Sequence, residues 1–191
     1  MMTIPEWRAA LEGSAARREL AALYGEDAPR QQARYRALLD AYGASFGDGT
    51  EVSIFSAPGR SEIGGNHTDH QNGRVLAAAV TLDAVACAAK ADGGAVTIKS
   101  EGYDKLTLTL DSLSPRVDEQ NASASLVRGV AAYFIEHGYR VGGFSAAVAS
   151  DVPKGSGLSS SAAYGVLIGT VLSGLYNGGG VAPAEIAKAV K

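Results

Sequence analysis

A glycine-rich turn followed by a long apolar segment narrows the choice of folds for this chain. The turn reads PKGSGLSSSAA at residues 153–163, and a β-type run, GGFSAAVAS at residues 142–150, comes just before it. The apolar segment, AAYGVLIGTVLSGLY at residues 162–176, is shorter than the ~20 residues that a bilayer span needs, and three glycines interrupt it. We therefore predict a strand, a tight turn and a helix that is buried in a protein core.

The rest of the chain changes from helical to strand-like texture near residue 50. Residues 4–46 carry apolar side chains at helical spacing, and Pro29 is predicted to separate two helices. Helical spacing returns at residues 123–137. Short runs bounded by Gly, Asp and Pro are predicted as strands and cover residues 51–57, 79–90, 95–100 and 105–110. We expect an α+β fold, with a helical segment at residues 1–50 and a sheet-bearing domain at residues 51–191.

Composition places this chain among globular proteins and argues against some partners. Its 46% hydrophobic and 19% charged residues are ordinary for a folded domain. With 17 basic against 20 acidic residues, no basic face for nucleic acid is expected. The single cysteine, Cys87, allows no intramolecular disulfide and is predicted to be a buried, inert thiol. Because no signal-peptide pattern opens the chain, we predict a cytoplasmic protein that binds neither nucleic acid nor membrane.

The last residues, VAPAEIAKAVK at 181–191, have the pattern of a helix that begins near Pro183. No glycine or asparagine follows to cap it, so the pattern favours a helix that has been cut short. A natural end that frays is the alternative.

The turn at residues 153–163 has the parts of an anion-binding site. Glycines let backbone N–H groups approach phosphate oxygens, and the start of the following helix favours negative charge. It is not a Walker A loop, which ends in Gly-Lys-Ser/Thr, and it lacks the third glycine of the dinucleotide fingerprint. The residues alone leave open a plain alternative, a Gly/Ser-rich turn with a serine at the helix N-cap.

A second segment, APGRSEIGGNHTDHQNG at residues 57–73, concentrates polar side chains in a predicted glycine-punctuated loop. Asp69 can accept hydrogen bonds from two neighbouring sugar hydroxyls, while Asn66 and His67 both donate and accept. Arg60 is a fixed cation suited to a carboxylate or to a developing phosphoryl charge. The set favours a polyol site. Two alternatives remain, namely metal ligation by the HTDH run and a solvated loop without function.

Together, the two segments resemble the galactokinase branch of the GHMP kinase superfamily. APGRSEIGGNHTDHQNGRVL is similar to the galactokinase signature, PKGSGLSSSAA is similar to the superfamily's ATP loop, and the resemblance runs from about Tyr42 to the end of the chain. It implies the family's N-terminal domain, related to ribosomal protein S5 domain 2, with an active site in a cleft against a C-terminal domain. It also implies transfer of the γ-phosphoryl group of ATP, with Mg²⁺, to the anomeric hydroxyl of galactose.

The resemblance also implies a role for each matching residue. Arg60 is the expected catalytic cation, next to a carboxylate that acts as the base. The expected sugar-binding residues are Arg60, Glu62, Asn66, His67, Thr68 and Asp69. The expected ATP-binding residues are Gly155, Ser156, Gly157, Leu158, Ser159, Ser160 and Ser161. Ser161 is in addition the expected Mg²⁺ ligand, and no protein partner is implied.

This sequence departs from the commonest family pattern at two positions. The family usually has asparagine where this chain has Glu62, and glutamate where it has Asn66. Glu62 therefore substitutes for the family's glutamate only if its side chain reaches the same pocket. The exchange keeps open kinases of related sugars such as N-acetylgalactosamine or arabinose.

The resemblance further implies that several functional parts lie past the position matching Lys191. These are the aspartate base, an acidic Mg²⁺ ligand and the C-terminal domain. The 191-residue piece alone is therefore expected to be inactive. A non-catalytic sugar and ATP sensor is a further alternative, which the three intact serines disfavour.

Overall fold

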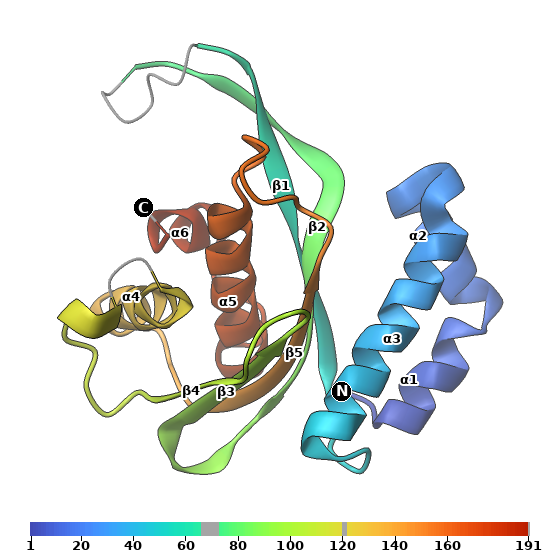
Figure 1. Ribbon diagram of the computed structural model, residues 1–191, viewed down its shortest axis with the longest axis horizontal. Coiled ribbons are helices and arrows are strands. Elements are labelled where there is room, and N and C mark those ends of the chain that lie inside the picture. The colour runs from blue at the N-terminus through green and yellow to red at the C-terminus, as the bar shows by residue number, and fades with distance from the viewer. Residues whose placement is uncertain (66–72, 120–121, 191) are drawn as a thin grey trace.

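Helices cover both faces of a mixed β-sheet in the computed structural model, which describes residues 1–65, 73–119 and 122–190 (Figure 1). Within these residues the sheet has five strands in the order β1-β2-β5-β3-β4. Neighbouring strands are antiparallel except β3 and β5, which are parallel. The strands are β1 (Ser53–Gly64), β2 (Leu76–Lys90), β3 (Ala95–Ser100), β4 (Leu106–Thr109) and β5 (Phe144–Ser150). The predicted α+β class is confirmed.

The layer on one face of the sheet consists of α1 (Ile4–Leu11), α2 (Ser14–Tyr24) and α3 (Ala28–Phe46). The prediction of two helices separated by Pro29 is wrong, because the chain also breaks at Gly13, which caps α2 with an extended backbone. Pro29 instead lies in the first turn of α3. A proline fits there because the first N–H groups of a helix have no intrahelical acceptor.

The opposite face is covered by α4 (Ser123–Glu136), α5 (Ser160–Asn177) and α6 (Pro183–Lys188). The predicted burial of the long apolar helix is confirmed, since Leu167, Ile168 and Leu172 of α5 are almost fully buried. In the part of the chain that the structure describes, no helix is long and apolar enough to cross a bilayer.

Strand β2 serves the cores on both faces, because successive side chains of a strand point in opposite directions. Ala84, Ala86 and Ala88 join the core under α4 and α5. Val85, Cys87 and Ala89 join the core under α1 and α3. Cys87 is fully buried there, and this burial raises the pKa of its thiol to about 12, as expected for an inert cysteine. The predicted division at residue 50 stays a prediction, and the second core includes residues from both sides of it.

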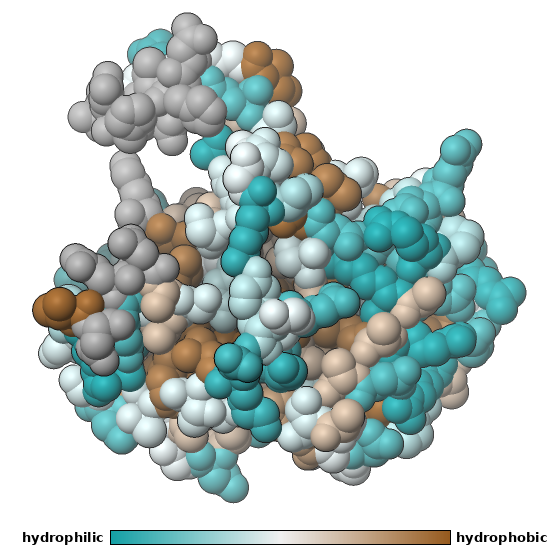
Figure 2. Space-filling model, in the orientation of Figure 1, coloured by the Kyte–Doolittle hydropathy of each residue, from teal (hydrophilic) through white to brown (hydrophobic). Residues whose placement is uncertain are grey.

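The prediction of a loop at residues 57–73 is wrong for residues 57–64, because β1 continues to Gly64. Pairing with β2 resumes past an irregularity between Pro58 and Arg60. Proline is tolerated in β1 because this strand is at the edge of the sheet. The outer end of the β1–β2 hairpin projects beyond the helices (Figure 1), and Figure 2 shows apolar surface on it, where Ile63 and Leu76 are exposed.

Candidate functional site

The glycine-rich turn of the sequence forms an exposed connection between β5 and α5, which we call the glycine loop (residues 151–159). Gly155 and Gly157 have φ angles of 70° and 76°, in the left-handed region where a side chain is unfavourable. A Cβ atom added at either position would meet nothing within 4 Å. Glycine is therefore required here by backbone conformation, and open space lies next to both residues.

Ser156 braces the glycine loop from within. Its hydroxyl donates to the carbonyl oxygen of Pro153 at 2.8 Å and accepts the N–H of Leu158 at 3.3 Å. A serine side chain that bonds to its own turn in this way stabilises the loop conformation. The hydroxyl of Ser156 is thus already engaged in holding the loop.

The glycine loop ends at Ser159, the N-cap of α5, with φ 60° and ψ 53°. Among the described residues, Ser159 is the only non-glycine with a positive φ. Such a conformation costs of order 1–3 kcal/mol and is concentrated at ligand-binding sites. Within the described first turn of α5, the side chain of Ser159 makes no capping hydrogen bond. The first N–H groups of the helix therefore have no side-chain cap from Ser159, and Ser161 in the same turn is exposed.

Arg60 lies against this loop, so the structure brings the two sequence motifs together. The backbone N–H of Arg60 in β1 donates to the carbonyl oxygen of Leu158 at 3.1 Å. Gly59 permits this approach, because an added Cβ would meet Leu158 O and side-chain atoms of Val80 and Val152, each at 3.2 Å. In Figure 1 the glycine loop is the orange segment that runs beside β1 above α5.

Glu62 lies two residues beyond Arg60 on the same strand. Arg60 and Glu62 pair in unbroken register with Ala79 and Ala77 of β2. Their side chains therefore project from the same face of the sheet, and both are half-buried. The remaining predicted sugar-binding residues, Asn66, His67, Thr68 and Asp69, lie outside the described residues.

Two charged residues of the glycine loop contact groups outside it. Lys154 places its ammonium 4.3 Å from the centre of the Tyr103 ring, which follows β3. At the start of the loop, burial raises the pKa of the Asp151 carboxyl, but hydrogen bonds from Arg30 and Gln31 outweigh this effect. The net result is a pKa below the ordinary value of 3.8.

The sequence reasoning missed a buried ion pair next to the site. Arg34 in α3 donates to the Asp83 carboxylate in β2 at 2.6 Å, with side chains 9% and 4% exposed. Asp83 also accepts from the hydroxyls of Ser56 and Tyr24. The available signal was a lone aspartate within the apolar run VTLDAVACA, because a buried carboxylate requires partners.

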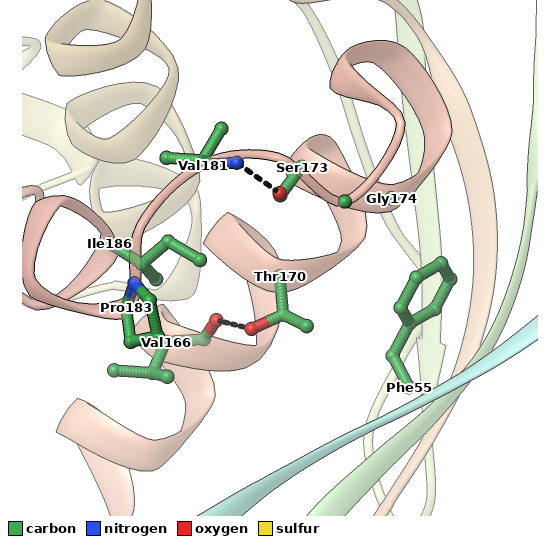
Figure 3. Close-up of a pocket in the computed structure, with 9 residues that line it drawn as sticks. Phe55, Val166, Thr170, Ser173, Gly174, Val181, Pro183 and Ile186 are labelled. Atoms are coloured by element: carbon green, nitrogen blue, oxygen red, sulfur yellow. Dashed lines mark hydrogen bonds between the residues drawn. The ribbon is translucent and has the colours of Figure 1, made fainter.

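A separate apolar pocket of about 420 Å³ lies between α5, α6 and β1. Figure 3 shows Phe55 of β1 facing the helices across it, with Ile186 and Pro183 of α6 on the other side. Both hydroxyls in the pocket lining are bonded to backbone groups. The Thr170 hydroxyl donates to Val166 O at 2.8 Å, and the Ser173 hydroxyl accepts from the N–H of Val181 at 3.2 Å. This pocket offers no polar set of the kind that distinguishes sugar hydroxyls.

Comparison with known proteins shows which class of protein this chain is similar to. A model of the GHMP kinase N-terminal domain matches residues 125–191, which include β5, the glycine loop and α5. The crystal structure of Methanococcus jannaschii mevalonate kinase superposes with a TM-score of 0.60 over 74% of this chain and 45% of that chain, at 19% identity. Residues 125–191, with the glycine loop, therefore match the GHMP kinase N-terminal domain, and the fold of the chain is similar to that of a mevalonate kinase.

The galactokinase galactose-binding signature matches residues 40–90, which contain β1 and β2. The chain is therefore similar to the N-terminal part of galactokinases. It is similar to galactokinase of Clostridium beijerinckii, 35% identical over 127 residues, 65% of this chain and 33% of that protein. Lactococcus lactis galactokinase, solved with galactose, has a TM-score of 0.71 and 30% identity, covering 78% and 39% of the two chains. The chain thus spans about a third of the curated relatives' length.

Proposed function

We propose that this chain is the nucleotide- and sugar-binding part of a galactokinase-type kinase, which phosphorylates galactose at its anomeric hydroxyl. The observation that carries the proposal is the hydrogen bond from Arg60 N–H to Leu158 O. It joins the strand of the galactose-binding signature to the glycine loop of the kinase domain. Phosphoryl transfer depends mainly on positioning the two substrates and neutralising charge, and a site at this junction suits both.

The glycine loop fits the phosphates of ATP. Open space lies beside two glycines, and the start of α5, which has no side-chain cap from Ser159, favours an anion. We assign phosphate contacts to Gly155, Gly157, Leu158, Ser159 and Ser160, with Ser156 supporting the loop conformation. Bound ATP supplies the phosphoryl group for transfer.

Ser161 suits the role of a Mg²⁺ ligand because its side chain is exposed in the first turn of α5. Within the described residues no three acidic, histidine or cysteine side chains cluster as a metal site. Mg²⁺ commonly binds through few protein ligands and keeps phosphate oxygens and waters as the others. The ion would neutralise charge on the phosphates.

On the sugar side, Arg60 and Glu62 are the described residues that we assign to the substrate. The guanidinium of Arg60 offers several N–H donors for phosphoryl oxygens as negative charge develops. The Glu62 carboxylate on the same face can accept from sugar hydroxyls. Asn66, His67, Thr68 and Asp69 stay proposed sugar ligands on the basis of the signature match.

The test is ADP release by the complete protein that contains this chain, with Mg·ATP and galactose, N-acetylgalactosamine or arabinose in parallel. We expect release to be fastest with galactose, and Arg60→Met to reduce it by roughly 10²–10³-fold, as for loss of one transition-state charge contact. Arg140→Met is the matched control, since Arg140 is exposed at the far end of α5 from the loop and we place it in no site.

Other outcomes would change the proposal. Release with only another sugar would mean that the Glu62 and Asn66 exchange alters specificity. Tight sugar binding with no release from any sugar would overturn the kinase proposal in favour of a sensor.

A further inference from the structure

Outside the two motifs, the most extensive buried polar network of the described residues links α3 to both of them. Its centre is the guanidinium of Arg34. Besides the Asp83 carboxylate, it donates to the backbone carbonyl oxygens of Asp83 at 2.8 Å and Ala149 at 3.2 Å. It also lies 3.5 Å from the carboxylate of Asp151. One side chain thus contacts β2, β5 and the first residue of the glycine loop.

The Asp151 end of this network holds the start of the glycine loop. Its carboxylate accepts from Arg30 at 2.8 Å and from the buried Gln31 at 2.9 Å. Its backbone N–H donates to the carbonyl oxygen of Asp83 at 2.9 Å. The loop therefore leaves β5 in a direction set by three residues of α3.

The Asp83 end holds the strand that carries Arg60. Asp83 pairs with Pro58 of β1, directly before the irregularity that precedes Arg60. Its carboxylate also accepts the hydroxyl of Ser56 from the same strand at 2.5 Å. The strand of Arg60 and the glycine loop are thus both bonded to Asp83, which Arg34 holds through its carboxylate and its carbonyl oxygen. The strand and the loop meet again at the bond between Arg60 and Leu158.

We propose that Arg34 is a positioning residue: through Asp83 and Asp151 it fixes the glycine loop relative to Arg60. The inference deepens the proposed function and rests on it for the identity of the ligand. A buried ion pair contributes little net stability compared with apolar packing. The planar guanidinium of Arg34 instead fixes the relative orientation of the elements that it joins, because its N–H groups donate to acceptors on separate elements at the same time.

The test compares hydrogen exchange in the full 191-residue chain with Arg34→Met and with the matched control Arg36→Met. Arg36 lies on the same helix, but its ion pair with Glu12 is exposed. In Arg34→Met, we expect exchange at residues 57–62 and 151–159 to rise roughly tenfold, as for a local opening that loses a charged hydrogen bond. The interior of α5, residues 165–175, should exchange as before, and the control should match the unmodified chain.

Two outcomes would overturn the proposal. One is unchanged exchange in both motifs, and the other is an equal rise throughout α5, which would make Arg34 a residue of general stability. If Arg34→Met does not fold, Asp151→Asn tests the loop end of the network, with the same expected rise at residues 151–159. Arg34→Lys keeps the positive charge but loses the planar set of N–H donors. Compared with Arg34→Met, it should recover more of the folding stability than of the slow hydrogen exchange in the glycine loop.

A second readout separates this proposal from the proposed function. Titration of the complete protein that contains this chain with Mg·ATP should give an affinity that Arg34→Met lowers roughly tenfold, in line with the lost loop contact, while Arg36→Met leaves it unchanged. Absence of Mg·ATP binding in the unmodified complete protein would count against the proposed function. The exchange measurement, made without ligand, would still decide whether Arg34 positions the loop.

Discussion

At the residue scale, the candidate site is defined by backbone conformation as much as by side-chain chemistry. Gly155, Gly157 and Ser159 all have left-handed backbone within one short connection. A plain turn before a helix needs one such residue at most, whereas successive N–H groups that point to one side need several. The strain at Ser159 is consistent with a loop selected for the direction of its N–H groups.

Gly157→Ala tests whether this conformation is needed. We expect the free energy of unfolding to fall by about 1 kcal/mol, because alanine is strained at φ 76° although nothing crowds its Cβ. Mg·ATP affinity should fall as the loop relaxes. Chemical denaturation and nucleotide titration measure the two effects. Gly129→Ala is the control, since Gly129 is an exposed helical glycine in α4 and the change should stabilise by about 0.5–1 kcal/mol.

The thiol of Cys87 provides a second residue-scale prediction. Burial excludes reagents and raises its pKa to about 12, so very little thiolate exists at pH 8. We expect a disulfide reagent to label the native chain only at the rate of unfolding, and to label it at once in denaturant. Rapid labelling of the native chain would mean that the helical layer over β2 opens easily.

At the element scale, close contacts made possible by glycine set how α5 lies on the sheet. A Cβ at Gly174 would come within 2.3 Å of the Phe55 ring in β1. A Cβ at Gly165 would come within 2.5 Å of Leu126 in α4. These approaches set how closely α5 packs against β1 near its C-terminal end and against α4 near its N-terminal end.

Gly174→Ala is therefore predicted to lower the free energy of unfolding by about 1–3 kcal/mol through overpacking against Phe55. Phe55→Leu in the same chain should recover part of this loss, because it removes the clashing ring atoms. Thermal unfolding of the two single variants and the double variant gives the coupling. Strictly additive losses would show that the two residues do not clash.

Elements with a clear local pattern were predictable from sequence, and contacts between distant segments were not. Residues 95–100 form β3 with the predicted bounds, because Val96 and Ile98 alternate with polar residues in the sequence and are buried in the structure. The glycine loop was likewise found, since its two glycines and two serines fall within one short segment. The contacts of Arg34 with Asp83 and Asp151 depend on how α3 lies across two strands, and no local pattern records that arrangement.

At the scale of the whole molecule, β2 makes the two helical layers interdependent. The buried side chains of β2 alternate between the two cores. Unfolding of either helical layer would therefore expose one face of this strand to water. The Arg34 network adds polar contacts between α3 and two strands. The site thus depends on α3 in one layer and on α5 in the other, and we expect the described parts of the chain to unfold as one cooperative unit.

This cooperativity has a direct test because Trp7, the one tryptophan of the chain, lies in the α1–α3 layer. Leu167→Ala, in the opposite core, removes a fully buried side chain from α5. It should lower the free energy of unfolding by about 2–5 kcal/mol. If the layers are coupled through β2, the denaturation midpoint from Trp7 fluorescence shifts by the same amount as the midpoint from circular dichroism.

The reciprocal variant, Leu39→Ala in the core beside Trp7, should shift both midpoints equally as well. If Leu167→Ala leaves the denaturation midpoint from Trp7 fluorescence unchanged, the α1–α3 layer unfolds as a separate unit. In that case α3 could not position the glycine loop.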